Sequence, residues 1–217
     1  MNKLDRPGAS FHSSMLSMLA HRIHSMPLAV TLPIASFDPR DYSTGEPGIQ
    51  GIVDLVKWEL WRWSPDGSSS RHALATSLEE IGNSGLLPPT HPLIPHIIPA
   101  RTMLLEALAM FSNDFMEHLL ELPTHSSAYL SVTASSILPL LRSATLKSEI
   151  LPVFCGSATR HIGTEIIMDY AGELLASPLD VSHGAGSSQC PVRALAWKVS
   201  WDKRRGWMTF VRVYSGL

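Results

Sequence analysis

The chain has 217 residues, a formal net charge of −2 and 45% hydrophobic residues. This balance is typical of one large globular domain or of one and a half small ones, and it excludes a polybasic or disordered chain. We therefore expect no sequence-specific nucleic-acid partner. The two cysteines, Cys155 and Cys190, form neither a disulfide framework nor a zinc pattern. No apolar run approaches membrane-spanning length, so no membrane partner is expected.

The chain opens on Asn2-Lys3-Leu4-Asp5, which has the Asn-Lys-x-Asp pattern that guanine-nucleotide-binding proteins use to read the base. The Asp5 carboxylate only accepts hydrogen bonds, so it can take two from the ring N–H and the exocyclic amine of guanine. Adenine presents a lone pair instead of the ring donor and is repelled. The methylene stem of Lys3 can cover the base plane, and the Asn2 amide can brace the loop and reach the base edge.

Apolar periodicity predicts a helix over 11–23, with Ser10 as its N-cap and Met26-Pro27 as its stop. A short apolar run at 28–34 predicts a strand, and a β-branched and aromatic run at 51–63 predicts a long strand or a hairpin arm.

The run at 51–63 contains three tryptophans, and a turn-rich patch at 38–48 precedes it. Such aromatic side chains can form a stacking platform for bases, or they can be packing and rim residues of a small sheet. We favour packing.

From residue 64 to 99, serines, glycines and the prolines at 88, 89, 92, 95 and 99 predict an extended excursion that sustains neither a helix nor a central strand. His91 and His96 are expected to be exposed loop residues there. Helical spacing returns at 100–122, and 131–146 reads as another helix that carries Pro139, which implies a late start or a kink.

A short apolar run at 149–155 predicts a buried parallel strand, and it ends in Gly156-Ser157-Ala158. A helix is predicted after Gly163-Thr164, with its inner face formed by Ile166, Ile167, Tyr170, Ala171, Leu174 and Leu175. Ligands bind at the carboxyl ends of such strands. In guanine-nucleotide folds the Ala158 N–H at this turn would donate to the guanine carbonyl, and the Ser157 hydroxyl would brace Asp5.

The sequence pattern changes in the last part of the chain, from helices and strands to strands alone. A Gly/Ser-rich linker at 182–188 leads to two predicted strands, 194–201 and 207–214, joined by a turn at 202–206. This pattern is typical of the opening hairpin of an all-β domain.

Together these motifs resemble the elongation factor G family of translational GTPases. The segments that carry the resemblance stand in the same order and spacing as in that family along nearly the whole chain: Asn2-Lys3-Leu4-Asp5-Arg6, Gly8-Ala9-Ser10-Phe11, Leu32-Pro33-Ile34, Gly51-Ile52-Val53-Asp54-Leu55-Val56, Met116-Glu117, Leu151-Pro152-Val153-Phe154-Cys155-Gly156-Ser157-Ala158, Ser177-Pro178-Leu179-Asp180 and Phe210-Val211-Arg212-Val213-Tyr214-Ser215-Gly216. The 64–99 excursion and the sequence around 103–120 look more like a fungal mitochondrial branch of the family, which releases ribosomes during recycling.

The resemblance implies an α/β fold: the C-terminal part of a P-loop GTPase domain with its inserted α+β subdomain, followed by the first hairpin of a β-barrel domain. Residues 1–180 would be the GTP-binding part with the insertion at about 28–147, residues 181–191 a linker, and residues 192–217 the start of the second domain. The implied guanine-binding residues are Asn2, Lys3, Asp5, Ser157 and Ala158.

The resemblance also implies GTP or GDP as ligand, Mg²⁺ in complete family members, the ribosome as partner, and a mitochondrial or otherwise cytoplasmic location. The chain contains no G-x-x-x-x-G-K-[ST] loop, and no D-x-x-G precedes the tetrad. We therefore expect base contacts only, no catalytic residue or metal ligand, and no GTP hydrolysis by the chain alone. One interpretation is a partial GTPase acting in translocation or recycling. The alternative is a non-catalytic fragment that at most binds a partner.

Other chemistry-bearing residues receive plainer interpretations. His21 and His24 lie one turn apart without a further metal ligand nearby, which favours a solvated helix face. Cys155 ends a buried strand, so we expect packing rather than a nucleophile paired with His161. Lys203-Arg204-Arg205 can touch ribosomal RNA by resemblance, but a solvated hairpin tip is favoured.

Overall fold

The computed structural model describes residues 1–6, 8–35, 49–64, 67–87, 90–123, 128–177, 180 and 192–215. The chain divides into two compact units, Met1–Leu175 and Ala176–Leu217, and each is described by itself. The predicted linker at 181–191 and the turn-rich patch at 38–48 lie outside the described residues.

Helix α1 spans Phe11–Ala20, and the Ser10 side chain accepts from the Ser13 backbone N–H, so the predicted helix and its N-cap are confirmed. The apolar residues of the predicted helix differ in burial. Phe11 is buried, whereas Leu19 and Ile23 are 46% and 64% exposed.

The predicted strand at 28–34 is in fact two strands, β1 (Pro27–Ala29) and β2 (Thr31–Ala35), which enter different sheets. Strand β1 pairs in parallel with β6 (Leu151–Val153), which confirms the predicted parallel strand. Strand β2 pairs antiparallel with the next strand along the chain. The single residue between β1 and β2, Val30, is fully buried.

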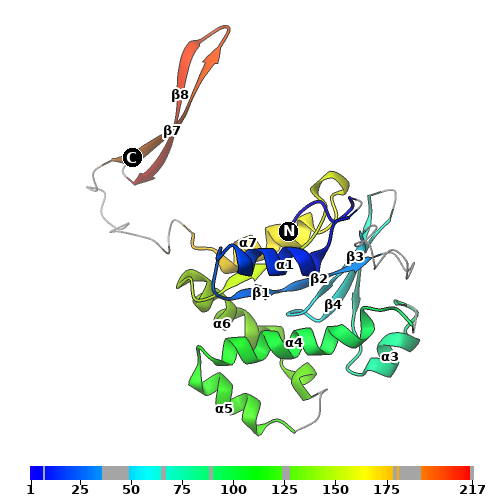
Figure 1. The fold of residues 1–217 in the computed structure, drawn as a ribbon. Coiled ribbons are helices and arrows are strands. Elements are labelled where there is room, and N and C mark those ends of the chain that lie inside the picture. Colours follow the sequence, from blue (N-terminus) through cyan, green and yellow to red (C-terminus); the bar gives the residue numbers. More distant parts are fainter. Residues whose placement is uncertain are drawn as a thin grey trace. The chain divides into compact units, whose positions relative to one another are not determined.

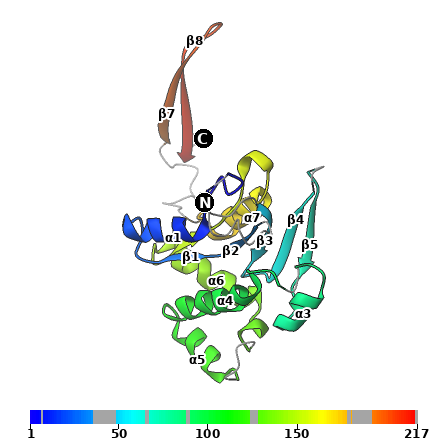
Figure 2. The same cartoon turned by 45° about the vertical axis from the view of Figure 1, so that its right-hand side comes forward.

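The predicted hairpin arm is confirmed as β3 (Ile49–Asp54) and β4 (Glu59–Trp63). With β2 and β5 (Ser69–Ala73) they form an antiparallel sheet in the order β2-β3-β4-β5 (Figure 2). Trp58 and Trp61 are buried, and the Trp58 indole N–H donates to a backbone carbonyl. These two tryptophans are therefore packing residues, as expected.

The prediction that 64–99 sustains no helix is wrong, whereas the strand in it, β5, lies at the edge of the sheet and not at its centre. Besides β5, the segment contains α3 (Leu78–Asn83) and the first turns of α4 (Ile94–Ala109). Strand β5 is exposed along its length and owes its conformation to pairing with β4 rather than to an apolar pattern. His91, expected to be exposed, is buried, and its ring accepts from the Leu93 N–H at the start of α4.

The predicted helix over 100–122 is two helices, α4 and α5 (Asn113–Glu121). The break falls at Ser112, whose side chain accepts from the Phe115 N–H and begins a new helix. A short 3₁₀ turn at Ala128–Ser131 then leads to α6 (Ala134–Leu146), which begins three residues later than predicted and still keeps Pro139 inside it.

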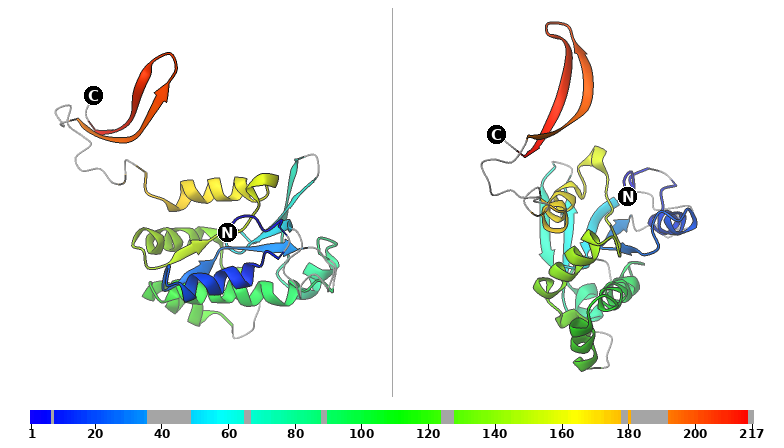
Figure 3. Two further views of the ribbon diagram at one scale, coloured as in Figure 1. Left: turned by 45° about the horizontal axis from the view of Figure 1, so that its top comes forward. Right: turned by 90° about the vertical axis from the view of Figure 1, so that its left-hand side faces the viewer.

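Helix α7 (Thr164–Leu174) is confirmed, with Ile166, Tyr170 and Leu174 buried. Ile167 and Leu175, which were placed on the inner face, are 39% and 56% exposed. In the first unit, β1, β2 and β6 lie between α7 on one side and α1 and α4 on the other (Figure 3). The core is one continuous cluster through these layers.

The second unit, in its described part, contains the hairpin of β7 (Arg193–Asp202) and β8 (Gly206–Ser215), as predicted. Trp201 and Trp207 are register partners near the turn of the hairpin. Their ring centroids lie 5.5 Å apart, and the rings pack edge to face. The Asp202 carboxylate accepts from the Arg204 and Arg205 N–H groups and so fixes the turn.

Candidate functional site

Two loops that are far apart in the sequence lie side by side in the first unit. One is the opening loop before α1, and the other runs from Gly156 to Gly163 between β6 and α7 (Figure 1). The Leu4 N–H donates to the Gly156 carbonyl at 3.4 Å, and Leu4 itself is buried. The structure therefore brings all five residues predicted from the two motifs to one place.

Asp5 and Ser157 lie at the centre of the contact between the two loops. The Ser157 hydroxyl donates to Asp5 Oδ1 at 2.6 Å, across 152 positions of sequence. Ser157 is 1% exposed, and the Asp5 side chain is 9% exposed. The hydrogen bond that the sequence predicted between these two side chains is present, and it fixes the direction of the Asp5 carboxylate.

Asn2 makes the second link between the loops. Its side-chain oxygen accepts from the Lys3 N–H at 2.7 Å and from the Ala158 N–H at 2.9 Å. The Ala158 N–H, which we expected to point at a ligand, is here donated to Asn2. Lys3 has a left-handed backbone with φ of 67° and an exposed side chain, so its ammonium reaches solvent.

Backbone contacts close the second loop on itself. Ser157 and Ile162 exchange two hydrogen bonds, with N···O distances of 2.9 and 3.0 Å. A side chain at Gly156 would place its Cβ 2.4 Å from the Ile162 carbonyl oxygen. Gly163, with φ of 80°, has the left-handed backbone that glycine tolerates best. The loop therefore needs glycine at both ends.

The electrostatics favour an ionised Asp5. The hydrogen bond from Ser157 lowers the pKa of Asp5 most, and the positive charges of Arg160 and Arg6 lower it further, while burial opposes them. Both guanidinium Nε atoms lie 3.9 Å from Asp5 Oδ2. Asp5 is thus held as a carboxylate, the form that accepts hydrogen bonds.

We expect Ser157→Ala to raise the pKa of Asp5, because it removes the largest cause of the lowering. A lowered pKa means that Asp5 stabilises the folded state above its unfolded pKa, and that this stabilisation disappears as pH falls through the folded pKa. In the variant the loss should begin at higher pH. Carbon-13 NMR of the Asp5 carboxyl group against pH measures the change. The control is Ser17→Ala, because Ser17 lies on α1 and its hydroxyl contacts His21 at the end of that helix.

Arg160 was not singled out from the sequence, although it stands three residues after Ser157 in the same loop. Among the described residues, no group of three or more His, Cys, Asp or Glu side chains could hold a metal ion. The described helices include none that is long and apolar enough to cross a membrane.

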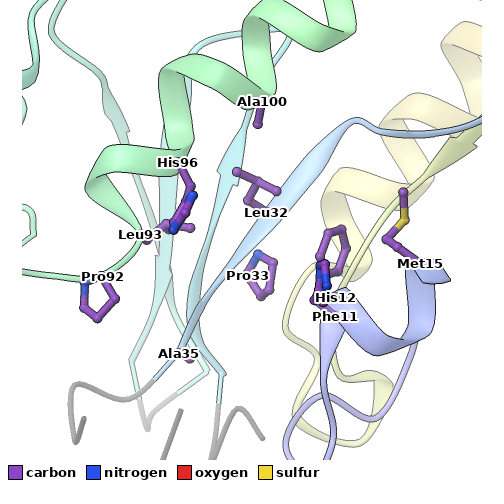
Figure 4. A pocket seen from close by; sticks show the side chains of 10 residues that line it. All are labelled: Phe11, His12, Met15, Leu32, Pro33, Ala35, Pro92, Leu93, His96 and Ala100. Atoms are coloured by element: carbon purple, nitrogen blue, oxygen red, sulfur yellow. The ribbon is translucent and has the colours of Figure 1, made fainter. Parts of the chain in front are cut away.

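A separate cavity of about 400 Å³ lies among α1, β2 and α4. Figure 4 shows its lining residues: Phe11, His12, Met15, Leu32, Pro33, Ala35, Pro92, Leu93, His96 and Ala100. None of them is acidic, Lys or Arg, and none belongs to the predicted site. This cavity is apolar with two imidazoles, so it does not provide the charged partners that a phosphate needs.

The chain is similar to known proteins in sequence and in structure. The chain is 31% identical over 217 residues to "Ribosome-releasing factor 2, mitochondrial" of Rattus norvegicus and 27% identical over 233 residues to the protein of the same name from Vanderwaltozyma polyspora. Each match covers 100% of this chain but only 25% and 27% of those proteins, respectively, so the chain spans about a quarter of their length. A scan of protein-family models found no match.

Among solved structures, a crystal structure of a Thermus thermophilus protein matches 98% of this chain and 28% of its own chain, with a TM-score of 0.66 and 19% identity, which shows a shared fold. The matches confirm the resemblance to the elongation factor G family of translational GTPases. Its curated homologues over the whole chain are mitochondrial ribosome-releasing factor 2.

Proposed function

We propose that this chain is the guanine-recognition part of a translational GTPase that acts on the mitochondrial ribosome during recycling. The observation that carries the proposal is the meeting of the two base-reading motifs, through Asp5 with Ser157 and Asn2 with Ala158. The ribosome and the mitochondrion are supported by the names of the homologues. The parallel pairing of β1 with β6, directly before the second motif, also supports the proposal.

In this proposal Asp5 reads the base. Ser157 occupies one lone pair of Oδ1 and leaves the outer lone pairs of the carboxylate for the ring N–H and the exocyclic amine of guanine. Adenine has no ring donor at that position, so it would leave a desolvated charge without a partner, at a cost of about 1–3 kcal/mol or more. Selectivity thus comes from a carboxylate that is already oriented and ionised before the base arrives.

Ala158 and Asn2 read the opposite side of the base. The Ala158 N–H is directed at the Asn2 amide oxygen, and a guanine carbonyl can share it or replace that acceptor. Asn2 would then bring its amide NH₂ to the base edge, while the stem of Lys3 covers the base plane. Both motifs are needed, because neither loop offers donors and acceptors on both sides of the base.

The proposal assigns base contacts only. The sequence has no G-x-x-x-x-G-K-[ST] stretch to hold phosphates, and most nucleotide affinity in such folds comes from phosphate contacts. We therefore expect the chain to bind guanine nucleotides no more tightly than about 1 mM. Hydrolysis of GTP, with the Mg²⁺ that it requires, is proposed for the complete family member.

Exchanging a single acceptor tests the proposal. Asp5→Asn replaces one carboxylate oxygen by an NH₂ donor, which suits the second carbonyl of xanthine and opposes the amine of guanine. We expect the wild-type chain to prefer guanosine over xanthosine and adenosine monophosphates by about tenfold, and Asp5→Asn to prefer xanthosine monophosphate. Ligand-observed NMR titration measures the affinities. Asp114→Asn on α5 is the control, and equal affinities of the wild-type chain for all three nucleotides would contradict the proposal.

A further inference from the structure

Ser157 and Ala158 lie in a segment that residues of the antiparallel sheet contact both before and after these two positions in the sequence. On the side that precedes them, Thr31 of β2 is 1% exposed, and its hydroxyl oxygen accepts from the Cys155 N–H at 3.0 Å. Cys155 stands directly before Gly156 and is itself buried. The entry into the base-reading loop is therefore fixed by a side chain 124 positions away in the sequence.

After Ala158 in the sequence, helix α7 is contacted by Asp54 of β3. Asp54 is the register partner of Thr31. The Tyr170 hydroxyl of α7 donates to both oxygens of Asp54, at 2.8 and 2.9 Å. Asp54 also accepts from the Val56 and Lys57 N–H groups, at 2.9 Å each, so its carboxylate cannot turn away. Burial raises the pKa of Asp54, and these donors oppose the rise.

Ile52 of the same strand makes the third contact, where the loop ends and α7 begins. A Cβ at Gly163 would lie 2.6 Å from Ile52 Cδ1 and 2.8 Å from the Cys155 carbonyl oxygen. The end of the loop is thus packed against the side chain of Ile52 with no room for a further atom. A hydrogen bond of 3.0 Å from Ser69 of β5 to Glu165 attaches the first turn of α7 to the same sheet.

We infer that Thr31, Ile52 and Asp54 form a loop support that positions Ser157 and Ala158 for guanine recognition, which makes Thr31 and Tyr170 positioning residues. The inference rests on the proposed function. Its physical reason is that a hydrogen bond weakens steeply when its donor is displaced or turned, so a loop fixed at both ends keeps the Ala158 N–H in place. The recognition loop is therefore held by the sheet, and not only by the opening loop.

The test removes one contact without changing the shape of the side chain. Thr31→Val keeps the volume of Thr31 but loses the oxygen that holds the Cys155 N–H, whereas Thr31→Ser keeps that oxygen. For Thr31→Val we expect the dissociation constant for guanosine monophosphate, measured by NMR on the 217-residue chain, to rise about fivefold, because one hydrogen bond of typical strength no longer fixes the loop. Thr31→Ser should restore the wild-type value.

A second ligand separates positioning from general loss of structure. 2-Aminopurine riboside monophosphate lacks both the carbonyl that Ala158 would contact and the ring N–H that would donate to Asp5. Its remaining binding does not use the Ala158 N–H, so Thr31→Val should leave its affinity unchanged. Thr145→Val is the matched control, because that hydroxyl donates to the Leu141 carbonyl within α6. If Thr31→Val does not fold, as judged by the dispersion of its amide spectrum, Tyr170→Phe replaces it, with the same expected loss for guanosine monophosphate.

The outcomes distinguish the inference from the proposed function. A wild-type chain without preference for guanosine monophosphate over the 2-aminopurine nucleotide contradicts the proposed function and the inference with it. A wild-type chain with that preference, together with unchanged affinities in Thr31→Val and Tyr170→Phe, overturns the inference alone. Equal losses for both nucleotides also overturn it, because they indicate a structural role only.

Discussion

Arg101→Ala lowers the free energy of unfolding by about 3–5 kcal/mol, because it leaves several buried carbonyl groups without a donor and opens a cavity. Arg101 lies on α4 and is 1% exposed. Its guanidinium donates to the carbonyls of Leu55, Val56 and Val132, and its Nε donates to that of Tyr129. It thereby holds the turn between β3 and β4 against α4 and the segment before α6.

The electrostatics of Arg101 support a structural role. Burial lowers the pKa of Arg101 to about 10, and the negative charge of Asp54 opposes that shift. The guanidinium carbon also lies 4.9 Å from the centre of the Trp58 ring, a cation–π contact. Arg101 stays charged at neutral pH, and its positive charge is balanced by backbone carbonyls and an aromatic ring.

Urea unfolding of the chain, followed by circular dichroism, measures the effect of Arg101→Ala. Arg101→Lys keeps the charge but loses the planar set of donors, so it should recover less than half of the loss. Met103→Ala is the control on the same helix, because Met103 is 67% exposed, and it should change the free energy of unfolding by no more than about 0.5 kcal/mol. A loss below about 1 kcal/mol for Arg101→Ala would show that water replaces its hydrogen bonds.

Gly156→Ala is expected to cost about 2–4 kcal/mol and to abolish guanine binding, because overpacking at this position opposes backbone that cannot yield locally. Its Cβ would lie 2.4 Å from the Ile162 carbonyl oxygen, which accepts from the Ser157 N–H. Relief requires Ser157 and Ile162 to separate. That separation displaces the hydroxyl that holds Asp5 and the N–H of Ala158.

The same chain offers a matched control for Gly156→Ala. Gly172 lies inside α7, and a Cβ there would meet nothing within 4 Å, so Gly172→Ala should be neutral or stabilise the helix by up to about 1 kcal/mol. Both variants are compared by thermal unfolding and by titration with guanosine monophosphate. Retained guanine affinity in Gly156→Ala would contradict the assignment of this loop.

Local signals predicted most of the elements correctly. The Ser10 cap and the apolar runs marked α1, β6 and α7, because each signal acts within a few residues. The segment 64–99 failed because its structure depends on partners. Pro99 lies inside α4, which nevertheless forms since Ile97, Leu104 and their neighbours on one face are buried.

For the candidate site, the motifs predicted the residues and the contact of Ser157 with Asp5, but not the contact of Asn2 with Ala158. The two motifs specify which side chains can read guanine, and the structure brings those residues together. Thr31 carried no signal of its own, because its contact with Cys155 depends on how two distant strands meet. Arg101 likewise looks like a surface residue in the sequence, and only the packing of α4 reveals its buried role.

We propose that the two loops form one guanine site. Amide chemical-shift mapping of the nitrogen-15-labelled 217-residue chain during titration with guanosine monophosphate tests it most directly. We expect saturable shifts at Lys3, Ser157 and Ala158, which are absent with adenosine monophosphate, and a dissociation constant of about 1 mM or weaker. Saturable shifts that cluster elsewhere, or identical shifts with both nucleotides, would contradict the claim.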